Sequence, residues 1–501
     1  MTQKDVSRRE FLAKAASGAL ALAAVGDWSF AAPRNRKPLN ILFVTADDLD
    51  RNSLGCFGGK LKGLTPNLDK FASEGMRFER AHVNVAICMP SRIVLGTGLY
   101  GHNSGAMGFM HARPDVPSVI GLFQKAGYHL GVMGKVPHST PRVEDKWDYQ
   151  VARSELGDGR NPEIYYKKCK DFFDQCKEKK KPFYFMVNSH DPHRPFQRPG
   201  RPVRGAARPS RIYKSEDVPV PGFLPDLPGV RRELSYYCNS VRRLDDTFGK
   251  VMQALKESGF EDNTLVMFIS DNGIAVPFAK CNCYLASTRT PWLVRWPGVI
   301  KPGSVDKTHF ISGVDYLPTV LEAAGLPKLP RQDGKSFLPL LKGKTQAGRE
   351  SVFTQIDSKA GNGYVPMRCV QNGKFGYIFN AWSSGKARYR NNNEGLCMKS
   401  MEEAAKTNPE IAARVKVFRY RTLEEFYDLE NDPDCLNNLM NDPGYKQQRE
   451  AFLTKMDQWM VKTNDSLLEA FRNRYDKAGL RKGLRVARRA GSGIRPIPRK
   501  R

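Results

Sequence analysis

Short apolar runs, each followed by polar residues, are the clearest pattern along the chain. Four such runs lie at 40–45, 128–133, 183–188 and 265–270. Runs of this length without alternation are typical of strands that are buried on both faces of a sheet. Amphipathic stretches at 163–176 and 232–258 lie between them and predict helices. Strands that alternate with helices predict an α/β sheet with helices on its faces.

A further helix is predicted to begin at Pro66. Proline is tolerated in the first turn of a helix, and Thr65 before it is suited to cap the helix. Leu68 and Phe71 fall on one helical face, and Gly75 is expected to end the helix.

The pattern changes after residue 345. Short apolar segments at 367–370, 375–379 and 425–429 alternate with turn residues and predict a smaller antiparallel sheet. The stretch 195–228 is rich in Pro, Arg and Gly and is expected to be a long loop. We therefore divide the folded part into a larger α/β domain at 38–345 and a C-terminal subdomain at 346–470.

Composition and charge limit the classes of protein to which this chain can belong. Of the 501 residues, 40% are hydrophobic, which is enough for a large core and excludes wholesale disorder. No apolar run approaches the roughly 20 residues that span a bilayer. The net charge of +28 suits a polyanionic partner. Twelve cationic residues and one acidic residue lie in a basic tail at 471–501, for which a mobile solvated segment and a polyanion-binding segment both stay open.

The N-terminus has the pattern of a targeting segment. Residues 7–12 read SRREFL, and a weakly apolar stretch and small residues follow up to residue 32. This resembles a twin-arginine export signal, assigned here to 1–31, with a frayed amphipathic helix as the alternative. The resemblance implies the twin-arginine translocase as a partner and a periplasmic or secreted protein. The ten cysteines show no repeating framework and are predicted to be mainly buried thiols, with late pairing outside the cell left open.

Polar groups with metal-binding chemistry follow two of the predicted strands. Asp47 and Asp48 come directly after the first run, and Asp271 and Asn272 follow the last. Ligands gather at the carboxyl ends of strands in open α/β sheets, so we expect these four side chains to converge. Their oxygen atoms suit Ca²⁺ or Mg²⁺ better than zinc. The alternative is that each pair is only a cap or a turn.

A third motif supports the interpretation of these acidic pairs as parts of a functional site. The chain reads CMPSR at 88–92 and LGTG at 95–98. This resembles the signature of type I, formylglycine-dependent sulfatases of the alkaline phosphatase superfamily. The resemblance implies a large mixed sheet sandwiched by helices, with a smaller C-terminal subdomain on an antiparallel sheet. It also implies that a formylglycine-generating enzyme oxidises Cys88, and that position 88 joins the metal site, preferably with Ca²⁺.

The same resemblance assigns the remaining catalytic candidates. Lys135 is expected to hold sulfate oxygen, and His138 to contact the formylglycine hydroxyl, although it lies three residues after the lysine where the family has two. His190 and Lys280 are expected to face the leaving group. Arg92 belongs to the signature and is expected to brace residue 88.

Several segments look most similar to heparan N-sulfatases (sulfamidases). These segments are 190–194, 270–274 and 366–368. Two positions depart from family patterns: 285–287 reads LAS where many relatives have Glu-Gly-Gly, and Lys280 stands where the sulfamidase pattern has Arg. N-sulfate and O-sulfate therefore both stay open as the bond hydrolysed. His193 stays open as a structural residue behind the site.

These observations predict a sulfatase that acts on sulfated saccharides. One alternative is a phosphonate or phosphate-ester hydrolase of the same superfamily, because sulfuryl and phosphoryl groups make similar demands on a site. Another is an inactive sulfatase-like protein that binds acidic glycans. A nucleic-acid partner is not expected, since no nucleic-acid-binding motif occurs and the export signal points away from nucleic acid.

Overall fold

The computed structural model describes residues 37–491 except 201–202, 360–362 and 392–393. The predicted export signal at 1–31 and the end of the basic tail lie outside the described residues. No helix within the described ranges is long and apolar enough to cross a membrane. The described residues belong to one compact unit, and the boundaries proposed within it stay predictions.

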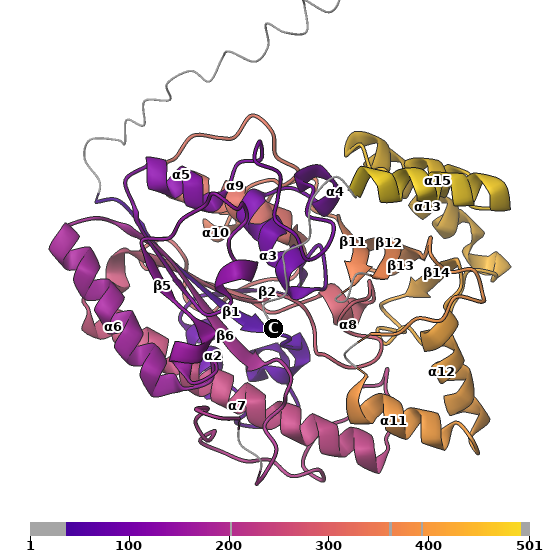
Figure 1. The fold of residues 1–501 in the computed structure, drawn as a ribbon, viewed down its shortest axis with the longest axis horizontal. Coiled ribbons are helices and arrows are strands. Elements are labelled where there is room, and N and C mark those ends of the chain that lie inside the picture. The colour runs from indigo at the N-terminus through magenta and orange to yellow at the C-terminus, as the bar shows by residue number, and fades with distance from the viewer. Residues whose placement is uncertain (1–36, 201–202, 360–362, 392–393, 492–501) are drawn as a thin grey trace, which may run out of the picture. The chain divides into compact units, whose positions relative to one another are not determined.

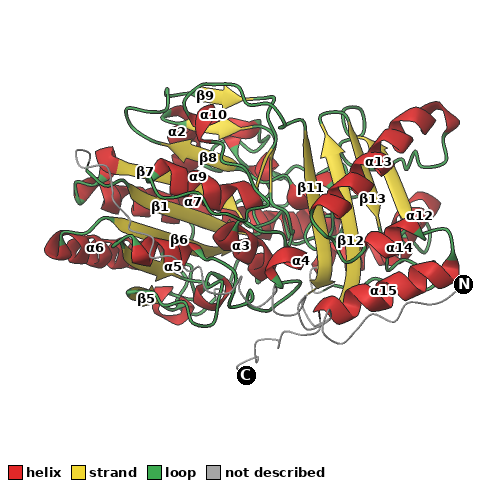
Figure 2. Ribbon diagram, turned by 90° about the horizontal axis from the view of Figure 1, so that it is seen from above, coloured by secondary structure: helices red, strands yellow, loops and turns green. Residues whose placement is uncertain are grey.

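An eight-stranded mixed sheet forms the larger part (Figures 1 and 2). Its strands, in spatial order, are β5 (Tyr149–Val151), β4 (His129–Met133), β6 (Phe183–Pro192), β1 (Asn40–Asp47), β7 (Thr264–Ser270), β8 (Trp292–Arg295), β2 (Met76–Phe78) and β9 (Ser304–Asp306). The central strand β1 runs parallel to β6 and β7, with Ile41 opposite Tyr184 and Leu265. Strand β8 is antiparallel to both of its neighbours. The carboxyl ends of β1, β6 and β7 therefore meet at one edge.

Helices cover both faces of this sheet (Figure 1). One face carries α2 (Pro66–Ser73), α6 (Pro162–Lys179) and α7 (Pro228–Glu257); the other carries α3 (Cys88–Thr97), α5 (Val119–Lys125), α9 (Tyr316–Ala323) and α10 (Leu338–Leu341). Alternate residues of β1 enter different cores: Leu42 and Val44 pack toward α6 and α7, whereas Ile41 and Phe43 pack toward α5 and α9. This two-sided burial explains why the strand sequence is uniformly apolar.

A four-stranded antiparallel sheet forms the C-terminal part (Figure 2). Its strands, in order, are β11 (Ser351–Lys359), β12 (Gly363–Asn372), β13 (Phe375–Phe379) and β14 (Glu424–Asp428). The helices of this region are α11 (Gly395–Ala404), α12 (Pro409–Tyr420), α13 (Lys446–Lys462), α14 (Leu468–Arg472) and α15 (Lys477–Gly491). Four short elements lie outside these groups: β3 (Ala81–His82), β10 (Ile311–Ser312), α4 (Gly101–Ser104) and α8 (Leu285–Thr288). Short 3-10 helices occur in several of the connecting segments. The fold class predicted from the sequence is confirmed.

Some local expectations need correction. Helix α2 begins at Pro66 as predicted, but the Thr65 side chain makes no capping hydrogen bond to it. The Thr65 hydroxyl donates to Asp69 instead, and the Asp245 carboxylate of α7 accepts the N–H groups of Asn67 and Leu68. A tertiary contact therefore supplies the cap.

The cysteines are all free thiols, and all except Cys56 are buried. The described part of the predicted loop contains no helix or strand between β6 and α7. Residues 477–491 of the basic tail form α15.

Candidate active site

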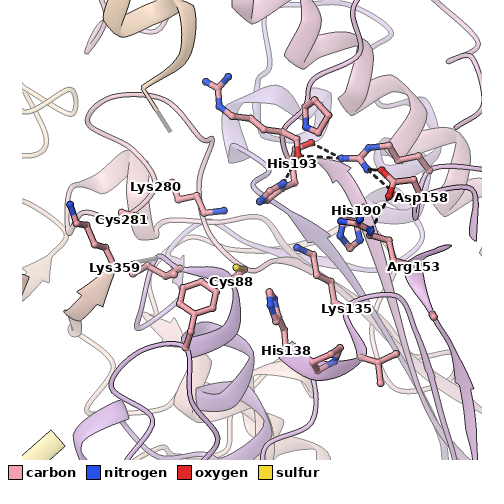
Figure 3. Close-up of a pocket in the computed structure, with 18 of the residues that line it drawn as sticks. Cys88, Lys135, His138, Arg153, Asp158, His190, His193, Lys280, Cys281 and Lys359 are labelled. Atoms are coloured by element: carbon pink, nitrogen blue, oxygen red, sulfur yellow. Dashed lines mark hydrogen bonds and ion pairs between the residues drawn. The ribbon is translucent and has the colours of Figure 1, made fainter. Parts of the chain in front are cut away.

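A cavity of about 850 Å³ opens at the carboxyl edge of the main sheet (Figure 3). All but one of the side chains predicted from the sequence to act on substrate line it: Cys88, Lys135, His138, His190 and Lys280. Arg92, the remaining one, lies fully buried below the cavity. The cavity falls in the range of roughly 300–1,000 Å³ that small-molecule sites occupy.

Four of the five predicted metal ligands, all except Cys88, meet beneath this cavity. Asp47 ends β1 and Asp48 follows it, Asp271 and Asn272 follow β7, and all four are fully buried. The backbone N–H of Asp48 donates to Asp271 Oδ1 at 3.1 Å, and Asn272 Nδ2 donates to Asp48 Oδ1 at 2.7 Å. Asp48 has φ of 72°, a left-handed conformation that is uncommon outside glycine. The sheet topology thus brings together two segments that are more than 220 residues apart.

Three cations neutralise these carboxylates. Lys135 forms an ion pair with Asp47, Lys280 forms one with Asp48, and Arg92 Nη2 lies 2.9 Å from Asp271 Oδ2. Burial disfavours the charged form of every group here, so the protonation state of each group depends on the partner of opposite charge beside it.

The pKa values follow from this competition. Burial alone would raise the pKa of Asp47, but Lys135, His193 and Lys280 hold it well below its usual range. Burial also opposes protonation of Lys280, but Asp48 raises its pKa well above the ordinary value. For Asp271, burial and the charge of Asp47 raise the pKa to about 7. Like charges crowded at one point are typical of a site that accepts a cation.

The free oxygen atoms test whether such an ion fits. Asp47 Oδ1, Asp48 Oδ2 and Asn272 Oδ1 are buried and make no hydrogen bond. One ligand atom from each of Asp47, Asp48 and His193 can be chosen so that all lie within 4.8 Å of one another. Buried oxygen atoms without donors are costly unless something else satisfies them, and a hard divalent cation would do so. Both oxygens of Asp271 already accept hydrogen bonds from protein groups.

Cys88 is the first residue of α3, and only 5% of it is exposed. Its sulfur faces the cavity that also receives the amino groups of Lys135 and Lys280 (Figure 3). Burial raises the pKa of the thiol, and the two lysines offset only part of that effect. An unmodified Cys88 is therefore a protonated thiol at neutral pH. One turn further along α3, Arg92 also donates to Thr45 and Asn188 and so joins α3 to β1 and β6.

Three histidines line the cavity as neutral groups. Burial, followed by the charge of Lys135, lowers the pKa of His138 to about 3 and that of His190 well below its usual value. Burial lowers the pKa of His193 to about 4, although Asp48 opposes this. Gly159 makes room for His190: it has φ of 71°, and a Cβ atom there would lie 2.8 Å from His190 Cβ.

A buried charge cluster behind these histidines was not predicted from the sequence. Asp191 accepts hydrogen bonds from Arg243 Nε and Nη2 at 2.6 and 2.9 Å, and Arg160 Nε lies 3.4 Å away. Arg160 also donates to the carbonyl of His193. The two arginines thus fix the segment that carries both histidines.

The outer wall of the cavity was also missed. It includes Lys359 at the end of β11, Asn391, and Arg153, whose Nε lies 2.8 Å from Asp158. No motif marks these residues. His193, in contrast, was noted in the sequence because it lies three residues after His190, and the structure places it at the cavity.

Comparisons with known proteins show which family the chain resembles. The family model described as Sulfatase matches residues 39–326. An ulvan-active sulfatase of Formosa agariphila is 30% identical over 87% of this chain and 82% of its own length. The human N-sulphoglucosamine sulphohydrolase is 28% identical over 86% of this chain and 91% of its own.

Solved structures show the same fold. One was determined with its substrate D-glucosamine-2-N,6-O-disulfate; it covers 86% of this chain and 99% of its own with a TM-score of 0.64 and 20% identity. A phosphonate monoester hydrolase of Agrobacterium radiobacter covers 85% and 96%, with a TM-score of 0.61 and 19% identity. The main sheet, its flanking helices and the extent of the family match lead to one conclusion: this chain belongs to the sulfatase family of sulfuric ester hydrolases.

Proposed function

We propose that this protein removes sulfate from a sulfated saccharide with formylglycine, formed from Cys88, as its nucleophile. The observation that carries the proposal is the position of Cys88, in one cavity with Lys135 and Lys280 and above buried oxygens that lack donors. The modification requires a formylglycine-generating enzyme as a partner. The proposed metal ligands are Asp47, Asp48, residue 88, Asp271 and Asn272, with Ca²⁺ preferred because the donors are oxygens.

A hydrated aldehyde at position 88 explains why the thiol would be replaced. The hydrate has two hydroxyl groups on one carbon. One hydroxyl gives up its proton as its oxygen attacks sulfur, the bond from sulfur to the leaving oxygen or nitrogen breaks, and the leaving group takes up a proton, so that the step neither gains nor loses protons overall. The second hydroxyl then loses its proton, the aldehyde C=O re-forms, and the bond to the sulfate oxygen breaks. Covalent catalysis in this form splits one difficult step into two.

The chain's own residues supply charge and protons in this scheme. Lys135 and Lys280 hold sulfate oxygens, and a bound divalent cation would add further stabilisation of negative charge. The leaving atom receives a proton from Lys280, or from His190 after this neutral histidine has taken up a proton. His138, which is neutral at pH 7, takes the proton whose loss releases sulfate. General acid–base groups of this kind contribute about 10²–10⁴-fold each, so most of the acceleration would come from the cations.

A saccharide is the proposed substrate class for two reasons. The cavity is large enough for a sugar ring and its substituents. The relatives named above act, by their names, on ulvan and on N-sulphoglucosamine. Whether the sulfate is carried on nitrogen or oxygen would be read from the products.

The test is a screen of defined N- and O-sulfated saccharides with free sulfate as the readout. It uses protein made in a host that has formylglycine-generating activity. We expect sulfate release from at least one sugar, a peptide mass at position 88 that matches formylglycine, and loss of release in Cys88→Ala. Full hydrolysis by Cys88→Ala would overturn the mechanism. Parallel aryl sulfate and aryl phosphate esters test the phosphoester alternative, and an unmodified, inert Cys88 would favour a glycan-binding protein.

We also propose that residues 1–31 direct export through the twin-arginine translocase, so that the protein acts in the periplasm or outside the cell. The paired arginines at 8 and 9 support this. Replacing both with lysine should retain the protein in the cytoplasm, as measured by cell fractionation. Unchanged export would refute the assignment.

A further inference from the structure

Helix α15 (Lys477–Gly491) carries charge that the catalytic site does not use. It packs on α14 (Figure 2). Leu480, Leu484 and Ala487 pack against the hydrophobic core. A Cβ atom at Gly483 would lie 2.4 Å from the backbone nitrogen of Ala470, so glycine is what allows the two helices to approach this closely. The protein therefore already covers most of the apolar side of α15, and Val486, which is about half exposed, is the exception.

The other side of α15 is a strip of exposed cations, which we call the basic face. Its members are Lys477, Arg481, Lys482, Arg485, Arg488 and Arg489, all exposed to solvent. At 3.6 residues per turn they fall within an arc of about 140°, and they extend over roughly 18 Å of helix. The helix contains no acidic residue. Lys482 has a nearby anion, Glu469, at 3.3 Å.

The cations of the basic face repel one another, and an anionic partner would reduce this repulsion. Like charges at i, i+4 on a helix repel one another, as Arg481 and Arg485 do here. A polyanion that lies along the strip would remove this repulsion and release its own counterions. The arginines suit sulfate and carboxylate groups because the guanidinium presents paired donors.

The character of the two faces decides between kinds of polyanion. An amphipathic helix that binds membranes inserts its apolar face, but here Leu480 and Leu484 are committed to the core. Single-stranded nucleic acid is bound by aromatic side chains that stack on bases, and α15 has none. A linear anionic polysaccharide needs only a row of cations.

We propose that the basic face of α15 is a docking surface for a sulfated polysaccharide chain, separate from the catalytic cavity. The identity of the polymer rests on the proposed function, since the same chain would carry the sulfate groups that the active site removes. Docking on α15 would retain the polymer between successive cleavages and so lower KM for polymer but not for a monosaccharide.

The test compares two variants that lose the same charge. The first is the triple variant Arg481→Gln, Arg485→Gln and Arg488→Gln. The control is the triple variant Lys167→Gln, Lys177→Gln and Lys179→Gln on α6, a helix whose cations are interleaved with acidic residues. Binding of heparin and of dextran sulfate is measured by calorimetry over a range of salt concentrations, in a Cys88→Ala background so that no sulfate is removed.

We expect the α15 variant to bind heparin at least tenfold more weakly and to lose about two to three units from the slope of log K against log salt. The α6 variant should bind within twofold of the parent. With Cys88 present, the α15 variant should keep its kcat on a sulfated monosaccharide and show a raised KM on polymer. Circular dichroism checks folding, and the single charge reversal Arg485→Glu gives the same comparison with less perturbation.

Three results would overturn the proposal: equal loss in both triple variants, heparin binding that both retain, or tighter binding of the parent to phosphatidylglycerol vesicles or single-stranded DNA than to heparin. These are distinct from failure of the proposed function, which would appear as heparin binding without sulfate release from any saccharide.

Discussion

Replacing Arg243 with methionine removes the main partner of Asp191 and so tests the buried clamp behind the histidines. Methionine keeps much of the volume of the arginine stem but has no charge and no donor. Arg243 is fully buried, and besides Asp191 it donates to Gln197 and to the Ala207 carbonyl. The substitution therefore leaves a buried carboxylate and two buried acceptors without their donor.

The magnitude follows from what remains around Asp191. Breaking one side of a buried ion pair typically costs about 3–5 kcal/mol of unfolding free energy. Arg160 stays 3.4 Å from the carboxylate and compensates in part, which places the expected loss near the lower limit, about 3 kcal/mol. Adding Asp191→Asn removes the unpaired charge, so the double variant should recover part of the loss.

Urea unfolding followed by circular dichroism measures these differences as a double-mutant cycle. The rate of sulfate release measured on the same samples should fall by a larger factor than the fraction of folded protein. The reason is that the segment that carries His190 and His193 loses the ion pair that holds it in place. A loss below about 1 kcal/mol in Arg243→Met, or additive effects of the two substitutions, would refute the reasoning.

Three further outcomes are expected. Ca²⁺ should raise the melting temperature of the parent and not that of Asp48→Asn, since a ligand at 100 times its Kd stabilises by about 2.7 kcal/mol; equal shifts would argue against the site. Despite burial, Arg368 lowers the pKa of Asp465 to about 2, so this group stabilises the fold above pH 4 and should lose about 2–3 kcal/mol as the pH falls toward 2. Urea midpoints at both pH values would show this in the parent and not in Asp465→Asn. Gly159→Ala should lower kcat at least tenfold in steady-state assays, because its Cβ would displace His190; an unchanged kcat would contradict that.

The main sheet could be predicted because its strands are buried on both faces. A strand that is buried on both faces has a continuous apolar run, as in β1 and β6, and turns and surface helices do not have such a run. The C-terminal part was harder to predict from the sequence. Strand β11 mixes polar and apolar residues, and the apolar spacing of Leu480, Leu484 and Ala487 in α15 was hidden by the surrounding cations.

The residues of the candidate site also fall into two groups, those that the sequence predicts and those that it does not. Cys88, Asp47 and Lys135 lie at the ends of strands or at the start of a helix, where a short motif fixes their position. Arg243 and Lys359 reach the site only through tertiary packing of α7 and β11, which leaves no local mark in the sequence. His193 was visible in the sequence, but its proximity to Asp48 depends on how the end of β6 folds.

Lys359 and Asn391 come from the C-terminal region, whereas Cys88 begins α3 and the buried carboxylates lie at the ends of strands of the main sheet. Under the proposed function, the residues assigned to bond cleavage and part of the wall that would contact the sugar are thus encoded in different stretches of the gene. Substitutions in the second stretch would then change the sugar that is accepted without changing the residues that cleave the bond.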